Sequence, residues 1–176
     1  NSEMKRNPES WQIDFAKVPK WDYCNGLELQ AFYKVWEKTG NEKYLNYIKS
    51  YTDTMITPDG LIKGYKFDEY NIDKVNSAKL LFPLYALYKD NKFRIALDHL
   101  RSQMRTHPKT ISGGFWHKKV YPNQMWLDGI YMASPFLAEY ALKFNDSQLF
   151  DEVAHQILTM AAHSYDPKTG LYFHAW

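Results

Sequence analysis

A chain of 176 residues has the length of a single domain. Its net charge is +2 and 24% of its residues are charged, so it lacks the strongly basic surface that nucleic-acid partners require. A single cysteine, Cys24, excludes an intrachain disulfide and a multi-cysteine zinc site, and there is no run of about 18 apolar residues to span a membrane.

Aromatic residues make up 17% of the chain, with 14 Tyr, 10 Phe and 6 Trp. Such rings fill hydrophobic cores, but they also offer flat faces with a polar edge, which is how proteins bind sugars. The six histidines do not form the HExxH zinc pattern, and no other ligand cluster has suitable spacing, so we expect no metal and no cofactor. The chain begins Asn1-Ser2-Glu3 without a methionine, which is consistent with a removed leader.

Six segments carry apolar residues at the helical spacing i, i+3, i+4, i+7, which predicts an all-α protein. In chain order they contain residues 29–36, 44–51, 77–88, 93–104, 127–134 and 150–160. Pro83 is expected to kink the third helix, and Pro135 lies in the first turns of the fifth. Consecutive segments are joined alternately by short turns and by long loops, and the long loops lie at residues 56–72 and 105–126. This pattern predicts three helical hairpins. The first helix of each hairpin is expected to begin near Tyr23, Asp73 and Leu127.

The hairpins repeat with a period of roughly 50–57 residues, in the range of helical arrays. Gly60, Gly114 and Gly170 mark the repeat and lie 54 and 56 residues apart. Asp73 lies 13 residues after Gly60, and Asp128 lies 14 residues after Gly114. Both carboxylates therefore stand where a long loop enters the first helix of a hairpin, and they are expected at one shared mouth. Helix capping alone, or an open α-solenoid, would also explain these positions.

Three sequence stretches resemble those of the unsaturated rhamnogalacturonyl hydrolases, glycoside hydrolase family 105, which are related to the unsaturated glucuronyl hydrolases. They are Gly113-Gly114-Phe115-Trp116-His117-Lys118, the stretch Gln124-Met125-Trp126-Leu127-Asp128-Gly129 with Met132, and Gly170-Leu171 through His174-Ala175-Trp176. The resemblance implies an (α/α)6 barrel of six hairpins. We expect residues 1–20 to form an N-terminal extension and residues 21–176 the N-terminal half of the barrel. A second half, or another chain, would complete the ring.

The resemblance also implies an oligosaccharide substrate with a C4=C5 double bond left by a polysaccharide lyase. Asp128 matches the general acid/base of the family. Its burial beside Trp126 and Met132 would help it to hold a proton by desolvation. Asp73 matches the second carboxylate, with the role of holding the water or a sugar hydroxyl. His117, Lys118 and His174 match positions lining the substrate pocket.

Further candidate substrate-binding residues are Trp126, which would stack on the unsaturated ring, Met132 beside it, and three positions before the first helix, Trp21, Tyr23 and Asn25. Core packing is the alternative role for Trp126. Three rival functions stay open at this stage. They are an unsaturated glucuronyl hydrolase acting on glycosaminoglycan fragments, a sugar epimerase with the same barrel, and a helical-repeat interaction module without activity.

Overall fold

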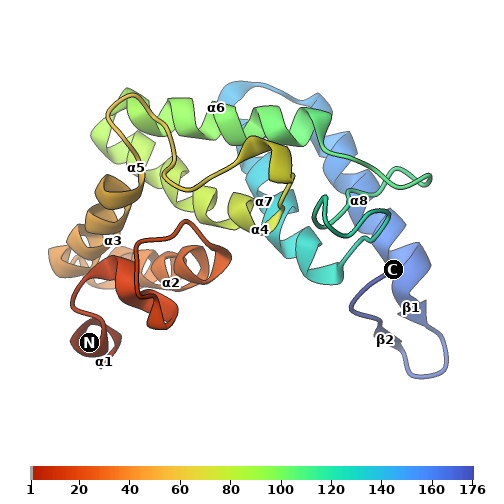
Figure 1. Ribbon diagram of the computed structural model, residues 1–176, viewed down its shortest axis with the longest axis horizontal. Coiled ribbons are helices and arrows are strands. Elements are labelled where there is room, and N and C mark those ends of the chain that lie inside the picture. Colours follow the sequence, from red (N-terminus) through yellow and green to blue (C-terminus); the bar gives the residue numbers. More distant parts are fainter. Residues whose placement is uncertain (1) are drawn as a thin grey trace. The chain divides into compact units, whose positions relative to one another are not determined.

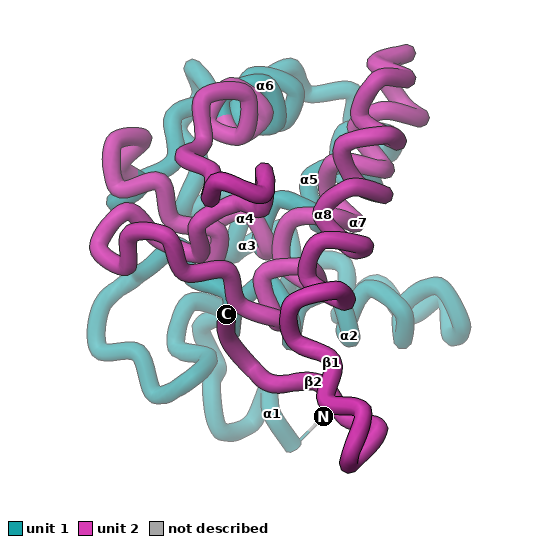
Figure 2. The backbone as a smooth tube through the Cα atoms, turned by 90° about the vertical axis from the view of Figure 1, so that its right-hand side faces the viewer, with its two compact units in different colours: residues 1–65, 77–99 teal, residues 66–76, 100–176 magenta. Residues whose placement is uncertain are grey.

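The computed structural model describes residues 2–176, and they are mainly helical (Figure 1). The chain divides into two compact units (Figure 2). Unit 1 comprises residues 1–65 and 77–99, and unit 2 comprises residues 66–76 and 100–176. The prediction of an all-α chain is confirmed, since the strands of the described residues are limited to one two-residue pair and isolated bridges.

Unit 1 contains the first predicted hairpin, α2 (Tyr23–Thr39) and α3 (Glu42–Met55). Asp22 caps α2 by accepting a hydrogen bond from the backbone N–H of Tyr23. Gly40 ends the helix with φ of 63°, a left-handed conformation that glycine adopts without strain, and Asn41 caps α3. The short turn and the start at Tyr23 are therefore as predicted.

Before this hairpin lie α1 (Ser2–Arg6) and a 3-10 helix, η1 (Ser10–Phe15), neither of which the apolar spacing predicted. Residues of η1 pack against α2 and α3, and Ile13 is fully buried. Trp21 stacks on Tyr51 with ring centroids 5.9 Å apart, in the core of the unit. The boundary at residue 21 between an extension and a barrel stays a prediction.

The third predicted helix is broken into three pieces around the expected kink. They are α4 (Asp73–Asn76), the 3-10 helix η3 (Ser77–Leu80) and α5 (Leu81–Tyr88). Pro83 lacks an N–H, and in an unbroken α-helix its ring would clash with the carbonyl of Lys79, four residues earlier. The helix α6 (Asn91–Thr106) follows after a short turn and runs from unit 1 into unit 2.

Unit 2 contains a 3-10 helix, η2 (Phe67–Glu69), α4, the end of α6, and the hairpin of α7 (Leu127–Phe144) and α8 (Gln148–Ser164). The helices α7 and α8 pack along each other, and Phe136, Leu137 and Met160 are buried in their core (Figure 1). Pro135 lies inside α7 without ending it. The helix starts predicted at Asp73 and Leu127 are confirmed.

Each long loop that follows a helical hairpin opens with a small antiparallel pairing. Ile56 bridges Ile62, Lys109 bridges Phe115, and β1 (Tyr165–Asp166) pairs with β2 (Leu171–Tyr172). The turns of these pairings contain Gly60, Gly113 and Gly170, all with positive φ. Gly113 is therefore the counterpart of Gly60 and Gly170, whereas the sequence repeat had used its neighbour Gly114.

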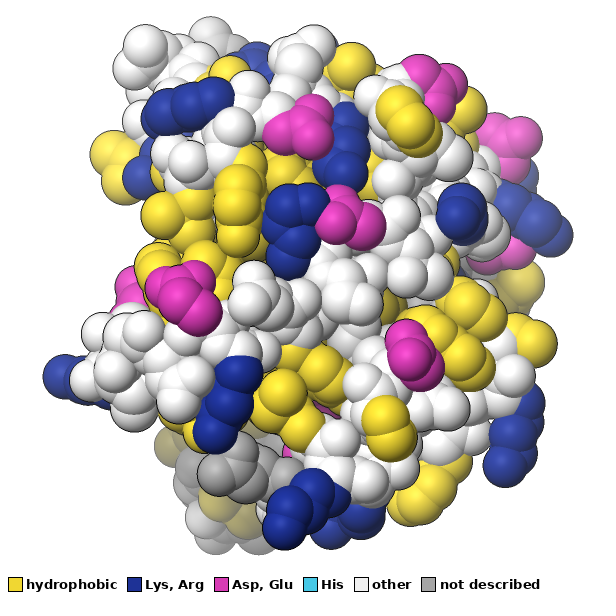
Figure 3. Space-filling view, turned by 90° about the vertical axis from the view of Figure 1, so that its left-hand side faces the viewer, with side chains coloured by type: hydrophobic (Ala, Val, Ile, Leu, Met, Phe, Trp, Pro, Cys, Tyr) yellow, Lys and Arg dark blue, Asp and Glu magenta, His cyan; other side chains and the backbone are white. Residues whose placement is uncertain are grey.

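The face of the molecule in Figure 3 shows hydrophobic side chains among Lys, Arg, Asp and Glu side chains, with both charge signs interspersed. This mixture of charge signs agrees with the net charge of +2. Across residues 2–176, no helix combines the length and the apolar character needed to cross a membrane.

Candidate active site

Asp73 is placed by a turn that Asn71 caps. The side-chain oxygen of Asn71 accepts a hydrogen bond from the backbone N–H of Asp73 at 3.0 Å, and α4 starts there. Asn71 therefore does the local capping, and the Asp73 carboxylate bonds to the side chains of His117 and Lys118 instead. Capping was the alternative role for Asp73, and the structure does not support it.

His117 is held by its backbone at both ends. Its N–H donates to the Gln124 carbonyl at 2.7 Å, and its carbonyl accepts from the N–H of Ile72 at 3.1 Å. The second bond ties the loop of His117 to the turn of Asp73. His117 and Asp73, which lie far apart in the sequence, are thereby brought together inside unit 2.

Asp128 lies in the first turn of α7, whose N-cap is Trp126. The alternative role of Asp128 as the N-cap of this helix is therefore wrong. The C-terminal segment pairs with the residues before α7. Met125 and Trp176 exchange both backbone hydrogen bonds, and the Leu127 N–H donates to the His174 carbonyl at 2.6 Å. This pairing places His174 Nε2 3.7 Å from Asp128 Oδ1.

Asp73 and Asp128 form one cluster with three further side chains, and the cluster runs from buried to exposed. His117 Nε2 lies 3.0 Å from Asp73 Oδ1 and 4.0 Å from Asp128 Oδ2, and Lys118 Nζ donates to Asp73 Oδ2 at 2.6 Å. The exposed fraction of the side chain is 1% for His117, 9% for Asp73, 35% for Asp128 and 66% for His174. Asp128 and His174 are therefore the members that a ligand can reach most easily.

The two carboxylates have different surroundings. Burial raises the pKa of Asp73, but the hydrogen bonds from His117 and Lys118 outweigh it, so the pKa ends below its usual 3.8. Asp73 is therefore held as a carboxylate. By contrast, Oδ1 of Asp128 is buried and accepts no hydrogen bond from residues 2–176.

Trp126 belongs to an aromatic group beside this cluster. It stacks on His117, with centroids 4.3 Å apart and planes 7° apart, and on Tyr121 at 5.2 Å and 15°. The His174 ring lies 5.4 Å from it. Much of the Trp126 ring is thus covered by other side chains of the protein, so a sugar could contact only the part of the ring that these side chains do not cover.

Asp73, His117 and Asp128 each offer one donor atom, and these atoms lie within 4.8 Å of one another. The sequence spacing had shown no ligand cluster, and in that respect the expectation is wrong, because the fold assembles one from three separate segments. Carboxylate and imidazole donors can bind a metal ion. However, the ammonium of Lys118 already neutralises Asp73 and would repel a cation.

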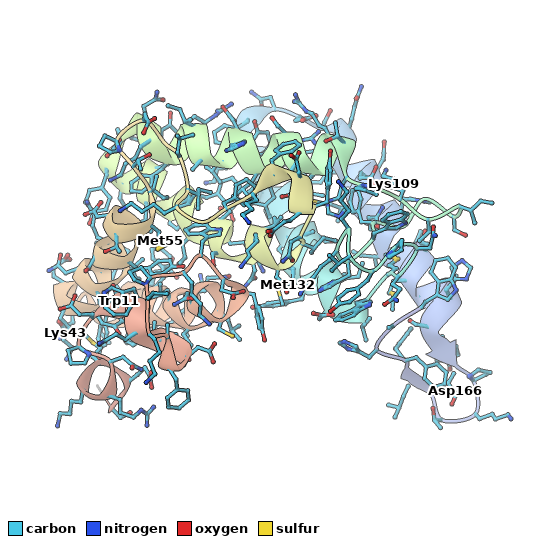
Figure 4. The ribbon with its side chains drawn as sticks, viewed as in Figure 1. Trp11, Lys43, Met55, Lys109, Met132 and Asp166 are labelled. Carbon is cyan, nitrogen blue, oxygen red and sulfur yellow. The ribbon has the colours of Figure 1, made fainter. Side chains whose placement is uncertain are left out.

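The remaining predicted residues are divided between the units. Met132 lies one turn after Asp128 on α7 and is buried (Figure 4). Trp21, Tyr23 and Asn25 belong to unit 1. Trp21 and Asn25 are 2% and 0% exposed, which goes against a role in lining a rim, whereas Tyr23 is 38% exposed.

Three residues that were not among the predicted site residues lie in the site or behind it. Tyr121 adds a ring to the aromatic group. His107 and Gln103 lie behind it, where His107 contacts the Trp116 carbonyl next to His117. The only sequence signal for His107 was its place just after a predicted helix, because a contact to a backbone carbonyl has no motif.

Comparisons with known proteins agree with this architecture. A glycoside hydrolase from family 105 of C. acetobutylicum shares 40% identity and a TM-score of 0.91 over 99% of this chain and 47% of its own. The unsaturated rhamnogalacturonyl hydrolase YesR of Bacillus subtilis is 26% identical over 95% of this chain and 47% of its own length. A glycosyl hydrolase of family 88 from Bacteroides vulgatus, at 18% identity and a TM-score of 0.67, has a similar fold.

The chain spans about half the length of these relatives. Its helical hairpins are of the type that forms the α/α barrel of the family 105 and family 88 structures. The profile of Glycosyl Hydrolase Family 88 matches residues 1–176, and the chain belongs to that family.

Proposed function

We propose that the complete protein hydrates the C4=C5 double bond of unsaturated uronyl oligosaccharides and thereby releases the neighbouring sugar. The observation that carries this proposal is the contrast between the two carboxylates. Asp73 is buried and bonded to His117 and Lys118, whereas Asp128 stands beside it, partly exposed and with Oδ1 free of hydrogen bonds from the described residues. Two carboxylates in such different surroundings suit two different roles.

In this proposal Asp128 is the general acid. Its carboxyl proton moves to C4 of the vinyl ether, and positive charge develops at C5 and the ring oxygen. A water oxygen then bonds to C5 and loses a proton, which restores the acid. The resulting hemiketal opens at the bond between C5 and the ring oxygen, and the hemiacetal left at C1 expels the neighbouring sugar.

In this proposal Asp73 does not react with the substrate but holds the side chains of His117 and Lys118 in place. Its side chain is 9% exposed and already bonded to two cationic or proton-bearing groups, which leaves little of it for a water. We assign it the role of fixing His117 and the ammonium of Lys118. His174, 66% exposed and 3.7 Å from Asp128, is the better placed group to contact a substrate.

Hydration also fits this geometry better than direct cleavage at the anomeric carbon. Inverting glycosidases need carboxyl groups roughly 6.5–9.5 Å apart with a water between them, whereas donor oxygens of Asp73 and Asp128 lie within 4.8 Å. A retaining enzyme needs a second carboxylate that can attack the sugar. Asp73 is too buried for that task.

The substrate that we propose is an unsaturated galacturonyl-rhamnose oligosaccharide, as formed in pectin degradation. The support is the similarity to YesR, whose name states unsaturated rhamnogalacturonyl hydrolysis. An unsaturated glucuronyl substrate from glycosaminoglycans is the alternative that the test must separate.

We further propose that more helices complete the site in the complete protein. A shallow groove of about 510 Å³ on α7 and α8 is lined almost entirely by apolar atoms, from residues that include Ile130, Pro135 and Ile157. A large exposed apolar face usually marks an interface. The relatives are about twice as long as this chain, which supports a further helical hairpin as the group that covers it.

The test is a rate measurement on the complete protein. Unsaturated galacturonyl-rhamnose, its saturated counterpart and an unsaturated glucuronyl glycosaminoglycan disaccharide are compared, and loss of the vinyl-ether absorbance and release of the second sugar are followed. We expect turnover of the first substrate, none of the saturated one, and no loss of rate with a chelator. Faster turnover of the glycosaminoglycan fragment would overturn the substrate, and cleavage of the saturated sugar would overturn the hydration chemistry.

A further inference from the structure

Behind the candidate site, His107 and Gln103 form a buried polar pair at the end of α6. His107 is 4% exposed and Gln103 is 0% exposed. His107 Nε2 lies 2.7 Å from the Trp116 carbonyl oxygen, and Gln103 Nε2 lies 3.4 Å from His107 Nδ1. Neither side chain belongs to the cluster of Asp73 and Asp128.

The partners fix the tautomer of His107. A carbonyl oxygen can only accept a hydrogen bond, so Nε2 must carry the proton and donate it to Trp116. Nδ1 is then an acceptor, and the Gln103 amide donates to it. The same amide nitrogen also lies 3.5 Å from the backbone carbonyl of Asn71, a second acceptor, which supports this orientation.

These contacts reach both segments that carry the cluster. Trp116 directly precedes His117, and its N–H is held by the Pro108 carbonyl at 2.9 Å. Asn71 caps the turn that presents Asp73. Through His107 and Gln103, the end of α6 is therefore bonded to the residue before His117 and to the cap of Asp73.

We propose that His107, supported by Gln103, is a positioning residue that sets the orientation of His117 towards Asp73. This role rests on the proposed function, since it serves the hydration reaction at Asp128. His107 touches no substrate. It holds the Trp116 carbonyl, and with it the backbone from which the His117 ring extends.

The surroundings of His107 keep this hydrogen bond in place. Burial is the largest cause that lowers the pKa of His107, and the hydrogen bond to the Trp116 carbonyl acts in the opposite direction. Together with the charges of His117 and Lys109, the net effect lowers this pKa to about 4. The rings of Tyr70 and Phe115 meet the imidazole edge-on, each with centroids 5.5 Å away. The imidazole thus stays neutral at working pH, with one defined donor.

Three substitutions in the complete protein test this role. His107→Phe keeps a ring between Tyr70 and Phe115 but has no donor. His107→Gln can place an amide N–H near the Nε2 position, whereas the shorter side chain of His107→Asn cannot reach it. The readouts are kcat and KM separately, the melting temperature, and the nitrogen NMR signals of the His117 ring, recorded without substrate.

We expect His107→Phe and His107→Asn to lower kcat by about 10²-fold, the effect of a small misplacement at a reacting centre, with KM unchanged and the His117 signals shifted. His107→Gln should restore both kcat and the signals. If the His107→Phe protein does not fold, the comparison of His107→Gln with His107→Asn tests the proposal. Equal kcat and unshifted His117 signals in all variants would overturn the proposal. The NMR comparison holds even if no hydration is seen, so a failure of the proposed function would be recognised separately.

Discussion

Replacing Gly129 by alanine should slow the enzyme while leaving its stability nearly unchanged. A methyl group at this position of α7 would lie 3.2 Å from His117 Nδ1 and 3.9 Å from Ile72 Cδ1. The contact with Ile72 is ordinary, but the contact with His117 is tight. The His117 ring would have to move by a few tenths of an ångström.

The His117 ring has little freedom to move. It stacks on Trp126 at 4.3 Å, it is 1% exposed, and its backbone is hydrogen-bonded at both ends. Rotation would lengthen its 3.0 Å contact with Asp73. We expect kcat to fall by about 10–10²-fold, since small misplacements at a reacting centre have effects of that size.

Stability should respond differently, because two effects offset each other. Alanine is favoured over glycine within a helix by about 0.8–1 kcal/mol, and a strained side-chain rotation costs about 0.5–1.5 kcal/mol. The net change in the free energy of unfolding should be within about 1 kcal/mol, which shifts the melting temperature by at most about 2–4 °C. The assay measures kcat by loss of vinyl-ether absorbance, and thermal unfolding on the same samples.

Gly40→Ala is the matched control. Gly40 has φ of 63° and no atoms near its hypothetical methyl group, so alanine there is strained by about 1–2 kcal/mol without touching the cluster. We expect a lower melting temperature and an unchanged kcat. A Gly129→Ala protein with wild-type kcat would refute the account of His117. A decrease in kcat that is proportional to the decrease in melting temperature in both Gly129→Ala and Gly40→Ala would also refute it.

Three further predictions concern charges and surfaces. Lys118→Met should lower the free energy of unfolding by about 1–2 kcal/mol at neutral pH. The pKa of Asp73 is lower in the folded protein than in the unfolded chain. The stability difference should therefore be fully present above the unfolded pKa of about 3.9 and should vanish as the pH falls through the lower folded pKa. Denaturant titrations that show the same difference at still lower pH would contradict this prediction. Asp146→Ala should lower the free energy of unfolding by about 2–3 kcal/mol in the same titrations, because Arg101, whose side chain is 10% exposed, loses its partner. A decrease below about 0.5 kcal/mol would contradict this prediction. Ile157→Lys should destabilise the complete protein by about 1–3 kcal/mol if helices cover the groove on α7 and α8, whereas an exposed position changes by at most about 0.5 kcal/mol.

The helices could be predicted from sequence because their signals are local. Asp22, Gly40 and Asn41 mark the boundaries of α2 and α3, and the apolar spacing marks their buried faces. The strands β1 and β2 were missed because a pair of two residues has no periodic pattern. The turn between them is fixed by Asp166, which accepts hydrogen bonds from Lys168 and Thr169, and by Gly170 with positive φ.

For the site, the repeat placed Asp73 and Asp128 at equivalent loop ends, and the structure brings them together. The burial of His117, its bond to Asp73 and the stacking on Trp126 depend on side-chain packing between distant segments, which spacing does not describe. The same limit hid the three-donor cluster and the role of His107. Each arises from contacts in space between segments that carry no shared motif.

The central claim is that Asp128 supplies the proton to C4, and the most direct test is the single-turnover rate of Asp128→Asn in the complete protein. The amide keeps the size and much of the hydrogen bonding of the side chain but cannot donate that proton. We expect the rate of vinyl-ether loss to fall by at least about 10²–10⁴-fold, with substrate affinity retained. An Asp128→Asn protein that hydrates the unsaturated disaccharide at a rate near that of the wild type would contradict the account.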